Sequence, residues 1–120
     1  MPTKQGPTFQ SIIHDLKSRK FSPIYVLMGD ESYYIDQISD YVATHVLSPE
    51  ERDFNQTVCF GSDVNAIHVT DMARRYPMMS EYQVIIVNEA QTIRSFDALE
   101  KYIKQTVKST HLVWCHKNRT

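Results

Sequence analysis

Cysteine is scarce in this sequence. Its 120 residues include two, Cys59 and Cys115, which stand far apart and form no Cys-x-x-Cys pair. This spacing argues against a disulfide framework and against a zinc knuckle, and it fits a reducing cytosol. We interpret both side chains as buried thiols, because free cysteine is among the most buried residue types.

An excess of one charge and a long apolar run are also missing. The sequence has 13 Lys and Arg residues and 14 Asp and Glu residues, so its formal net charge is −1. No basic field therefore indicates nucleic-acid binding. No apolar segment approaches the roughly 20 residues that span a bilayer, and residues 1–8 lack the apolar stretch of a secretion signal. We expect a cytoplasmic protein with no membrane contact.

Hydrophobic residues are present in the proportion that one folded domain needs. They make up 42% of the sequence, and 120 residues is the size of an ordinary domain. Segments with apolar residues at helical spacing alternate along the chain with short apolar or alternating runs. The pattern predicts helices around residues 9–20, 34–46, 64–75 and 96–107, and strands at residues 24–28, 54–60, 84–87 and 112–115.

Some of these predictions are specific about burial or boundaries. Residues 24–28 are apolar throughout, which favours a strand buried on both faces. Ser48–Glu51 is interpreted as the end of one helix followed by a short turn. In the helix around residues 64–75, the predicted apolar face consists of Val64, Ile67, His68 and Met72.

The order of the elements determines the expected fold. Alternation of strand and helix predicts an α/β fold with a doubly wound, mainly parallel sheet and helices on both faces. The last predicted strand runs almost to Thr120, whereas a sheet of this kind would normally continue. We therefore expect a truncated domain.

Ligands of a doubly wound sheet bind at the carboxyl ends of its strands, so the loop after the first strand is a candidate site. A phosphate-binding P-loop there would read Gly-x-x-x-x-Gly-Lys-[Ser/Thr]. The sequence has Gly29, Asp30 and Glu31 followed by Ser-Tyr-Tyr, without the second glycine or the lysine. Two carboxylates would also repel a triphosphate. We do not expect this loop to bind a nucleotide.

The third predicted strand ends in Asn88 and Glu89, where P-loop ATPases carry a metal-binding Asp followed by a Glu that prepares the attacking water. A neutral amide binds Mg²⁺ far more weakly than a carboxylate does. The sequence thus looks like an ATPase scaffold of P-loop type in which both halves of the nucleotide site are degraded. We expect no cofactor.

Other arrangements that could support chemistry are weak. His111, Cys115 and His116 could suggest a metal, but neighbouring residues of a strand point to opposite faces. A serine nucleophile would need a positioned base, and no Gly-x-Ser-x-Gly elbow is present. We expect no metal site and no catalytic residue.

The connection before the third strand contains Pro77, Met78 and Met79. Methionine is flexible and polarizable and is common at protein-binding surfaces, so two methionines in a polar connection are candidates for exposure. That both simply cover the core remains an equally open interpretation.

Three segments in order carry a resemblance to a known family. They are an apolar strand followed by Gly-x-[Asp/Glu]-x-Tyr in residues 24–34, Phe54-Asn55 at the second strand, and Pro-Met-x-Ser-Glu before the apolar strand in residues 77–87. Together they resemble the N-terminal domain of the delta subunit of bacterial DNA polymerase III, over roughly residues 20–120.

The resemblance implies an AAA+ fold without ATPase activity. It places a leader and first helix in residues 1–20 and the AAA+-like domain, incomplete at its C-terminus, in residues 21–120. Subunits of this family bind and open the β sliding clamp for loading onto primed DNA. They work with the gamma or tau ATPase subunits and the delta-prime subunit, and they meet DNA within the assembled complex. The chain would then be no enzyme itself, although the holoenzyme it serves is a DNA-directed DNA polymerase.

The resemblance also implies the binding residues. It assigns clamp binding to Pro77, Met78 and Met79, and family members often have Phe at the position of Met79. Two other functional classes remain as alternatives: an atypical P-loop-type nucleotide-binding enzyme, and a receiver-like or flavodoxin-like signalling domain.

Overall fold

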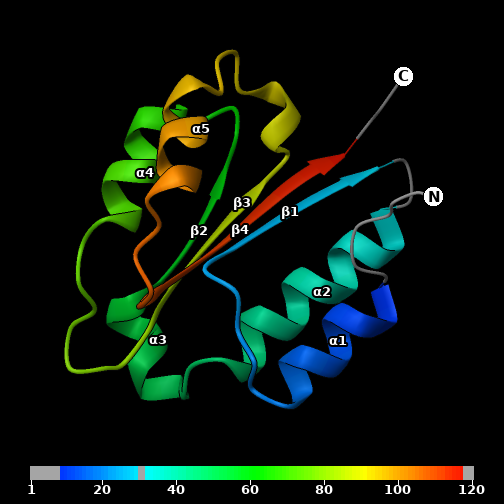
Figure 1. Ribbon diagram of the computed structural model, residues 1–120, viewed down its shortest axis with the longest axis vertical. Helices are drawn as coiled ribbons and strands as arrows, with labels where there is room; N and C mark the ends of the chain where they lie inside the picture. The colour runs from blue at the N-terminus through cyan, green and yellow to red at the C-terminus, as the bar shows by residue number, and fades with distance from the viewer. Residues whose placement is uncertain (1–8, 30–31, 118–120) are drawn as a thin grey trace.

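The computed structural model describes residues 9–29 and 32–117 (Figure 1). Helices and strands alternate along it, as the sequence predicts. The elements are α1 (Phe9–Lys17), β1 (Ile24–Gly29), α2 (Ser32–His45), α3 (Pro49–Asn55), β2 (Gln56–Phe60), α4 (Ala66–Ala73), β3 (Gln83–Asn88), the 3₁₀ turn η1 (Ala90–Thr92), α5 (Asp97–Lys104) and β4 (Thr110–Lys117).

The four strands form one sheet in the order β1-β4-β3-β2, and every neighbouring pair is parallel. The last strand of the described chain therefore lies between the first and the third. Trp114 is paired with Val26 on one side and with Val87 on the other. Parallel strands need crossover connections, and the helices provide them. The predicted α/β fold with a parallel sheet is confirmed.

Two apolar cores lie on the two faces of the sheet. On one face, α1 and α2 pack against β1, β3 and β4, with Leu16, Ile38 and Val113 among the buried residues. On the other face, α4 and α5 pack against β3 and β4 through residues such as Tyr102 and Trp114. Figure 1 shows the two helical layers, with α4 and α5 over one half of the sheet and α1 and α2 beside the other.

Strand β1 is buried on one face, not on both as its apolar sequence predicts. Tyr25 and Leu27 lie in the core with α1 and α2, whereas Val26 is 42% exposed and Met28 is 60% exposed on the opposite face. The reason is position: β1 is an outer strand of the described sheet, and α4 and α5 lie over the other half. A run that is apolar at every position does not reveal whether helices cover both of its faces.

Strand β2 is the other outer strand, and its exposed apolar side chains lie on the face of the sheet opposite to the one on which Val26 and Met28 are exposed. Val58 is 51% exposed and Phe60 is 49% exposed. Both line a hollow together with Ile86, which belongs to the face that α1 and α2 cover. The two helical layers are therefore offset from each other across the sheet.

The prediction for residues 48–55 is wrong in two respects. Ser48–Glu51 is not a turn but the start of α3, and Phe54 and Asn55 are the last residues of this helix, not the first residues of a strand. A capping box explains the helix: the Ser48 hydroxyl accepts the Glu51 N–H, and the Glu51 carboxylate accepts the Ser48 N–H. Pro49 in the first turn also favours a helix start.

The predicted apolar face of α4 is right for Val64 and Met72, which pack against the core, and wrong for Ile67 and His68. The side chains that α4 buries are mostly small, whereas Ile67 is 63% exposed and His68 is exposed. Small residues carry little weight in a search for apolar periodicity, although they let a helix approach the sheet closely. The buried residues are Ala66, Val69, Thr70 and Ala73.

Some sequence expectations fall on residues that the structure does not describe. The leader in residues 1–8 and the acidic pair Asp30 and Glu31 lie outside the described residues. In the part that is described, no helix is long and apolar enough to cross a bilayer.

Candidate functional site

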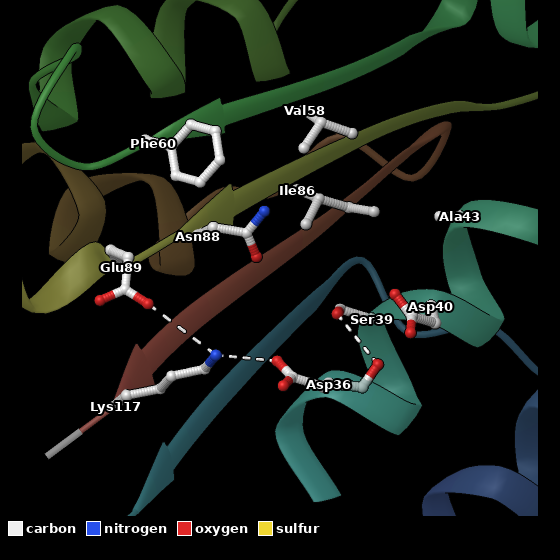
Figure 2. Close-up of a pocket in the computed structure, with 10 residues that line it drawn as sticks. All are labelled: Asp36, Ser39, Asp40, Ala43, Val58, Phe60, Ile86, Asn88, Glu89 and Lys117. Atoms are coloured by element: carbon white, nitrogen blue, oxygen red, sulfur yellow. Dashed lines mark hydrogen bonds and ion pairs between the residues drawn. The ribbon is translucent and has the colours of Figure 1, made fainter. Parts of the chain in front are cut away.

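The carboxyl ends of the strands border a cavity of about 320 Å³ between α2 and the sheet (Figure 2). Asn88 and Glu89, which the sequence places in the degraded nucleotide site, line this cavity. Gly29 is the last residue of β1 and lies at the same end of the parallel sheet. The remaining lining residues come from α2, β2, β3 and β4 and are Asp36, Ser39, Asp40, Ala43, Val58, Phe60, Ile86 and Lys117.

Lys117 carries the positive charge among the described residues that line this cavity. Its ammonium lies 2.8 Å from the Asp36 carboxylate and 3.8 Å from the Glu89 carboxylate, and its side chain is 12% exposed. Gln91 fixes the arrangement further, since it accepts the Lys117 backbone N–H at 3.0 Å and donates to Glu89 at 2.8 Å. Figure 2 shows the lysine extending between α2 and the end of β3.

The electrostatics of the cavity disfavour phosphate. The carboxylates of Asp36, Asp40 and Glu89 outnumber the one ammonium of Lys117. That ammonium is already paired with two of the carboxylates, so it is not free to neutralise a phosphate oxygen. Asn88 faces the cavity with a neutral amide. Among the described residues that line the cavity, no positive charge is thus left to balance a triphosphate.

The histidine and cysteine residues of β4 do not converge. Cys115 packs in the core with α1 and α2, whereas the ring of His116 lies 5.9 Å from Phe96, a residue of the opposite core. Burial raises the pKa of the Cys115 thiol to about 11. Within residues 9–29 and 32–117, no three His, Cys, Asp or Glu side chains gather closely enough to hold a metal ion.

The methionines before β3 occupy the other end of the sheet and are strongly exposed. Met78 is 62% exposed and Met79 is 102% exposed, so neither covers the core. Pro77 beside them is half-buried. Met79 also has a φ of 56°, in the left-handed region that non-glycine residues rarely adopt. We call Pro77, Met78 and Met79 the methionine tip.

The last residue of α3, Asn55, forms hydrogen bonds to the backbone of the methionine tip. The Asn55 side chain accepts the Met78 backbone N–H at 2.6 Å and donates to the Met78 carbonyl at 2.8 Å. Asn55 is 4% exposed, so both hydrogen bonds are shielded from water. The amide group of one side chain thereby holds both polar groups of one backbone residue.

A second link joins α3 to the residue after the tip. The Ser80 hydroxyl donates to the Glu51 carboxylate at 2.6 Å. This hydrogen bond and those from Ser48 lower the pKa of Glu51. Glu51 of the capping box therefore also holds Ser80, the residue that follows the methionine tip.

The connection is tied to the fold at its ends as well. The Gln83 amide donates to the carbonyls of Met72 and Arg75 at 3.0 and 2.8 Å, and it lies 3.0 Å from the Thr110 hydroxyl. These hydrogen bonds hold the backbone of the exposed apolar tip in one arrangement. Such a surface is suited to binding another protein.

Sequence reasoning found the methionines but missed the residues that hold them. The signal for Glu51 was present, since Ser48-x-x-Glu51 with Pro49 at the first helical position is a capping-box pattern. Asn55 belongs to the Phe54-Asn55 segment that carries part of the family resemblance, but its contact was not predictable, because its partner Met78 lies 23 residues further along the chain. Lys117 likewise meets Asp36 and Glu89 only in the folded chain.

The sequence model of the family described as "DNA polymerase III, delta subunit" matches residues 25–120 of the chain. No curated protein matches it. The match includes the methionine tip, β3 and the strand ends that line the cavity, and thus nearly all of the described sheet.

Two solved structures are similar to the fold. The Bacillus subtilis DNA clamp loader delta protein (YqeN) aligns with a TM-score of 0.82 and 23% identity, over 94% of this chain and 36% of that one. A DNA polymerase III gamma subunit-related protein from Thermotoga maritima aligns with a TM-score of 0.56 and 13% identity, over 88% and 39%. The chain thus spans somewhat more than a third of the length of either protein.

Proposed function

Because the chain belongs to the DNA polymerase III delta-subunit family, we propose that it acts in a clamp loader by binding and opening the β sliding clamp. The observation that carries the proposal is the methionine tip. It places two apolar side chains in solvent, and α3 holds its backbone through hydrogen bonds to Met78 and to Ser80.

The energetics of the methionine tip suit a protein-binding role. Burying one methionine side chain in a partner's pocket contributes about 1.5–3 kcal/mol. Two adjacent apolar side chains can form a hot spot that costs more than about 2 kcal/mol when it is truncated. Met79 can fill a pocket that takes Phe in other members, because a long, flexible thioether adapts to the shape around it.

The proposal includes the partners of the family. The chain would work with the gamma or tau ATPase subunits and the delta-prime subunit, in the cytoplasm, and would meet primed DNA within that assembly. It would supply no catalytic residue of its own. An atypical nucleotide-binding enzyme has less support, since Lys117 is engaged by Asp36 and Glu89 at the strand ends.

The test is a titration of the chain against the β sliding clamp of the same organism. We expect saturable binding by the wild-type chain. The double variant Met78→Ala/Met79→Ala should bind at least about tenfold more weakly, because it loses both apolar side chains. Circular dichroism should show the same fold for both proteins, since neither side chain covers the core.

A matched control separates loss of the tip from loss of exposed apolar surface in general. Ile67 of α4 is 63% exposed, close to the 62% of Met78. Ile67→Ala should therefore leave clamp affinity unchanged. Wild-type affinity in the double variant would remove the methionine tip from the interface, and no binding by the wild-type chain would contradict the function itself.

A further inference from the structure

The methionine tip has an arrangement that its own sequence does not favour. Met79 adopts a left-handed φ of 56° although it has a β-carbon, and its side chain is fully exposed, so no packing contact compensates. Residues outside 77–79 must therefore hold this backbone, and its hydrogen-bond partners identify them.

The strongest of these contacts comes from Asn55. Its carboxamide makes two hydrogen bonds, of 2.6 and 2.8 Å, to the N–H and the carbonyl of Met78, the residue directly before the strained one. Because these bonds engage the peptide groups on both sides of the Met78 α-carbon, they fix the orientation of the backbone as well as its distance. Since Asn55 is 4% exposed and ends α3, its own position is set by the helix and the core.

We propose that Asn55 is a positioning residue that preorganises Met78 and Met79 for clamp binding. This inference rests on the proposed function and adds a residue to it. When only a fraction of the free molecules has the binding-competent arrangement, the apparent dissociation constant rises in inverse proportion to that fraction. Asn55 keeps the fraction high without touching the partner.

A positioning role and a contact role predict different kinetics. Loss of a contacting side chain weakens the complex and mainly raises the dissociation rate. A variant without Asn55 still has both methionine side chains, but the backbone of the methionine tip becomes mobile in the free chain. The variant should therefore mainly lower the association rate. The rate constants therefore distinguish Asn55 from the methionines.

The experiment measures both rate constants of clamp binding for Asn55→Leu, a variant of similar shape without hydrogen-bonding groups. We expect its association rate to fall at least about fivefold, with a dissociation rate within about twofold of the wild-type value. Met78→Ala/Met79→Ala should instead raise the dissociation rate. Asn55→Asp retains the acceptor for the Met78 N–H but loses the donor to its carbonyl, so it should lie between Asn55→Leu and the wild type.

Asn65→Ala is the matched control for general destabilisation. The Asn65 side chain accepts the His68 N–H at the start of α4 and has no part in the methionine tip. Its variant should lose helix stability and keep wild-type rates. If Asn65→Ala slows association as much as Asn55→Leu does, the positioning role is wrong.

Hydrogen exchange of the free wild-type chain gives a second measurement that needs no variant to fold. The Met78 amide should exchange slowly, because its bond to a buried side chain must open first. Fast exchange at Met78 would overturn the proposal. So would wild-type rates for Asn55→Leu while the methionine double variant loses binding, a result that leaves the proposed function standing. No clamp binding by the wild-type chain would overturn both.

Discussion

At the scale of single residues, Met79 combines full exposure with a backbone conformation that lowers the stability of the fold. Its left-handed backbone crowds the β-carbon against the following carbonyl, at a cost of roughly 1–2 kcal/mol. Its full exposure means that no apolar burial compensates within the chain. The sequence predicts that Met79 is a candidate for exposure, but the amino-acid type at one position cannot predict a positive φ.

The first prediction separates the Met79 side chain from its backbone. Met79→Gly and Met79→Ala both remove the thioether, but only Ala keeps the β-carbon that is strained at this φ. We expect Met79→Gly to be more stable than Met79→Ala by about 1 kcal/mol in the free energy of unfolding. Urea denaturation of the two variants measures this difference, and the opposite order would contradict the conformation described for Met79.

At the scale of elements, α3 shows why a boundary was predicted wrongly. Phe54, Val58 and Phe60 alternate with polar or small residues, which favours a strand from the first of them. The chain instead continues α3 to Asn55 and passes directly into β2 at Gln56. Periodicity cannot place this boundary, because helix and strand meet without a loop. The capping box at the other end of α3 was the signal to use.

The second prediction concerns the acid stability of α3. Hydrogen bonds from Ser80, and then from Ser48, lower the pKa of Glu51 in the folded chain. The stabilisation is therefore fully present above the unfolded pKa of about 4.5 and is lost as the pH falls through the lower folded pKa. We expect the difference in melting temperature between the wild type and Glu51→Gln to be constant near neutral pH and to shrink below about pH 4.

Thermal unfolding followed by circular dichroism between about pH 3 and pH 7 measures that difference. Glu50→Gln is the control, since Glu50 lies beside Glu51 in the first turn of α3 and is exposed. It removes the same charge from the helix N-terminus without breaking the link to Ser80. A difference for Glu51→Gln that does not change with pH would contradict the role given to its ionised carboxylate.

At the scale of the whole molecule, the parallel sheet was predictable and the charges at its strand ends were not. Alternation of helix and strand predicts the sheet from local pattern alone. Asp36 lies on α2, Lys117 on β4 and Glu89 directly after β3, and only the strand order β1-β4-β3-β2 brings them together. No local spacing contains that information. The sequence therefore predicted a degraded nucleotide site from residues 29–31 after the first predicted strand and from Asn88 and Glu89 at the end of the third, without Lys117.

The third prediction follows from those charges. A nucleotide bound at about a hundredfold excess over its dissociation constant would stabilise the fold by about 2.7 kcal/mol. We expect no rise in melting temperature with ATP and Mg²⁺ at millimolar concentration, because the ammonium that the described lining residues contribute is paired with Asp36 and Glu89. Thermal unfolding with and without nucleotide measures this. A clear rise would favour the nucleotide-binding alternative.

The offset between the two helical layers divides the apolar surface of the sheet (Figure 1). Val26 and Met28 are bare on one face at the β1 edge, whereas Val58 and Phe60 are bare on the other face at the β2 edge. The two pairs lie on opposite faces and at opposite edges of the described sheet. A flat surface that covers one pair therefore does not reach the other, and each pair is open to contact from its own face of the sheet.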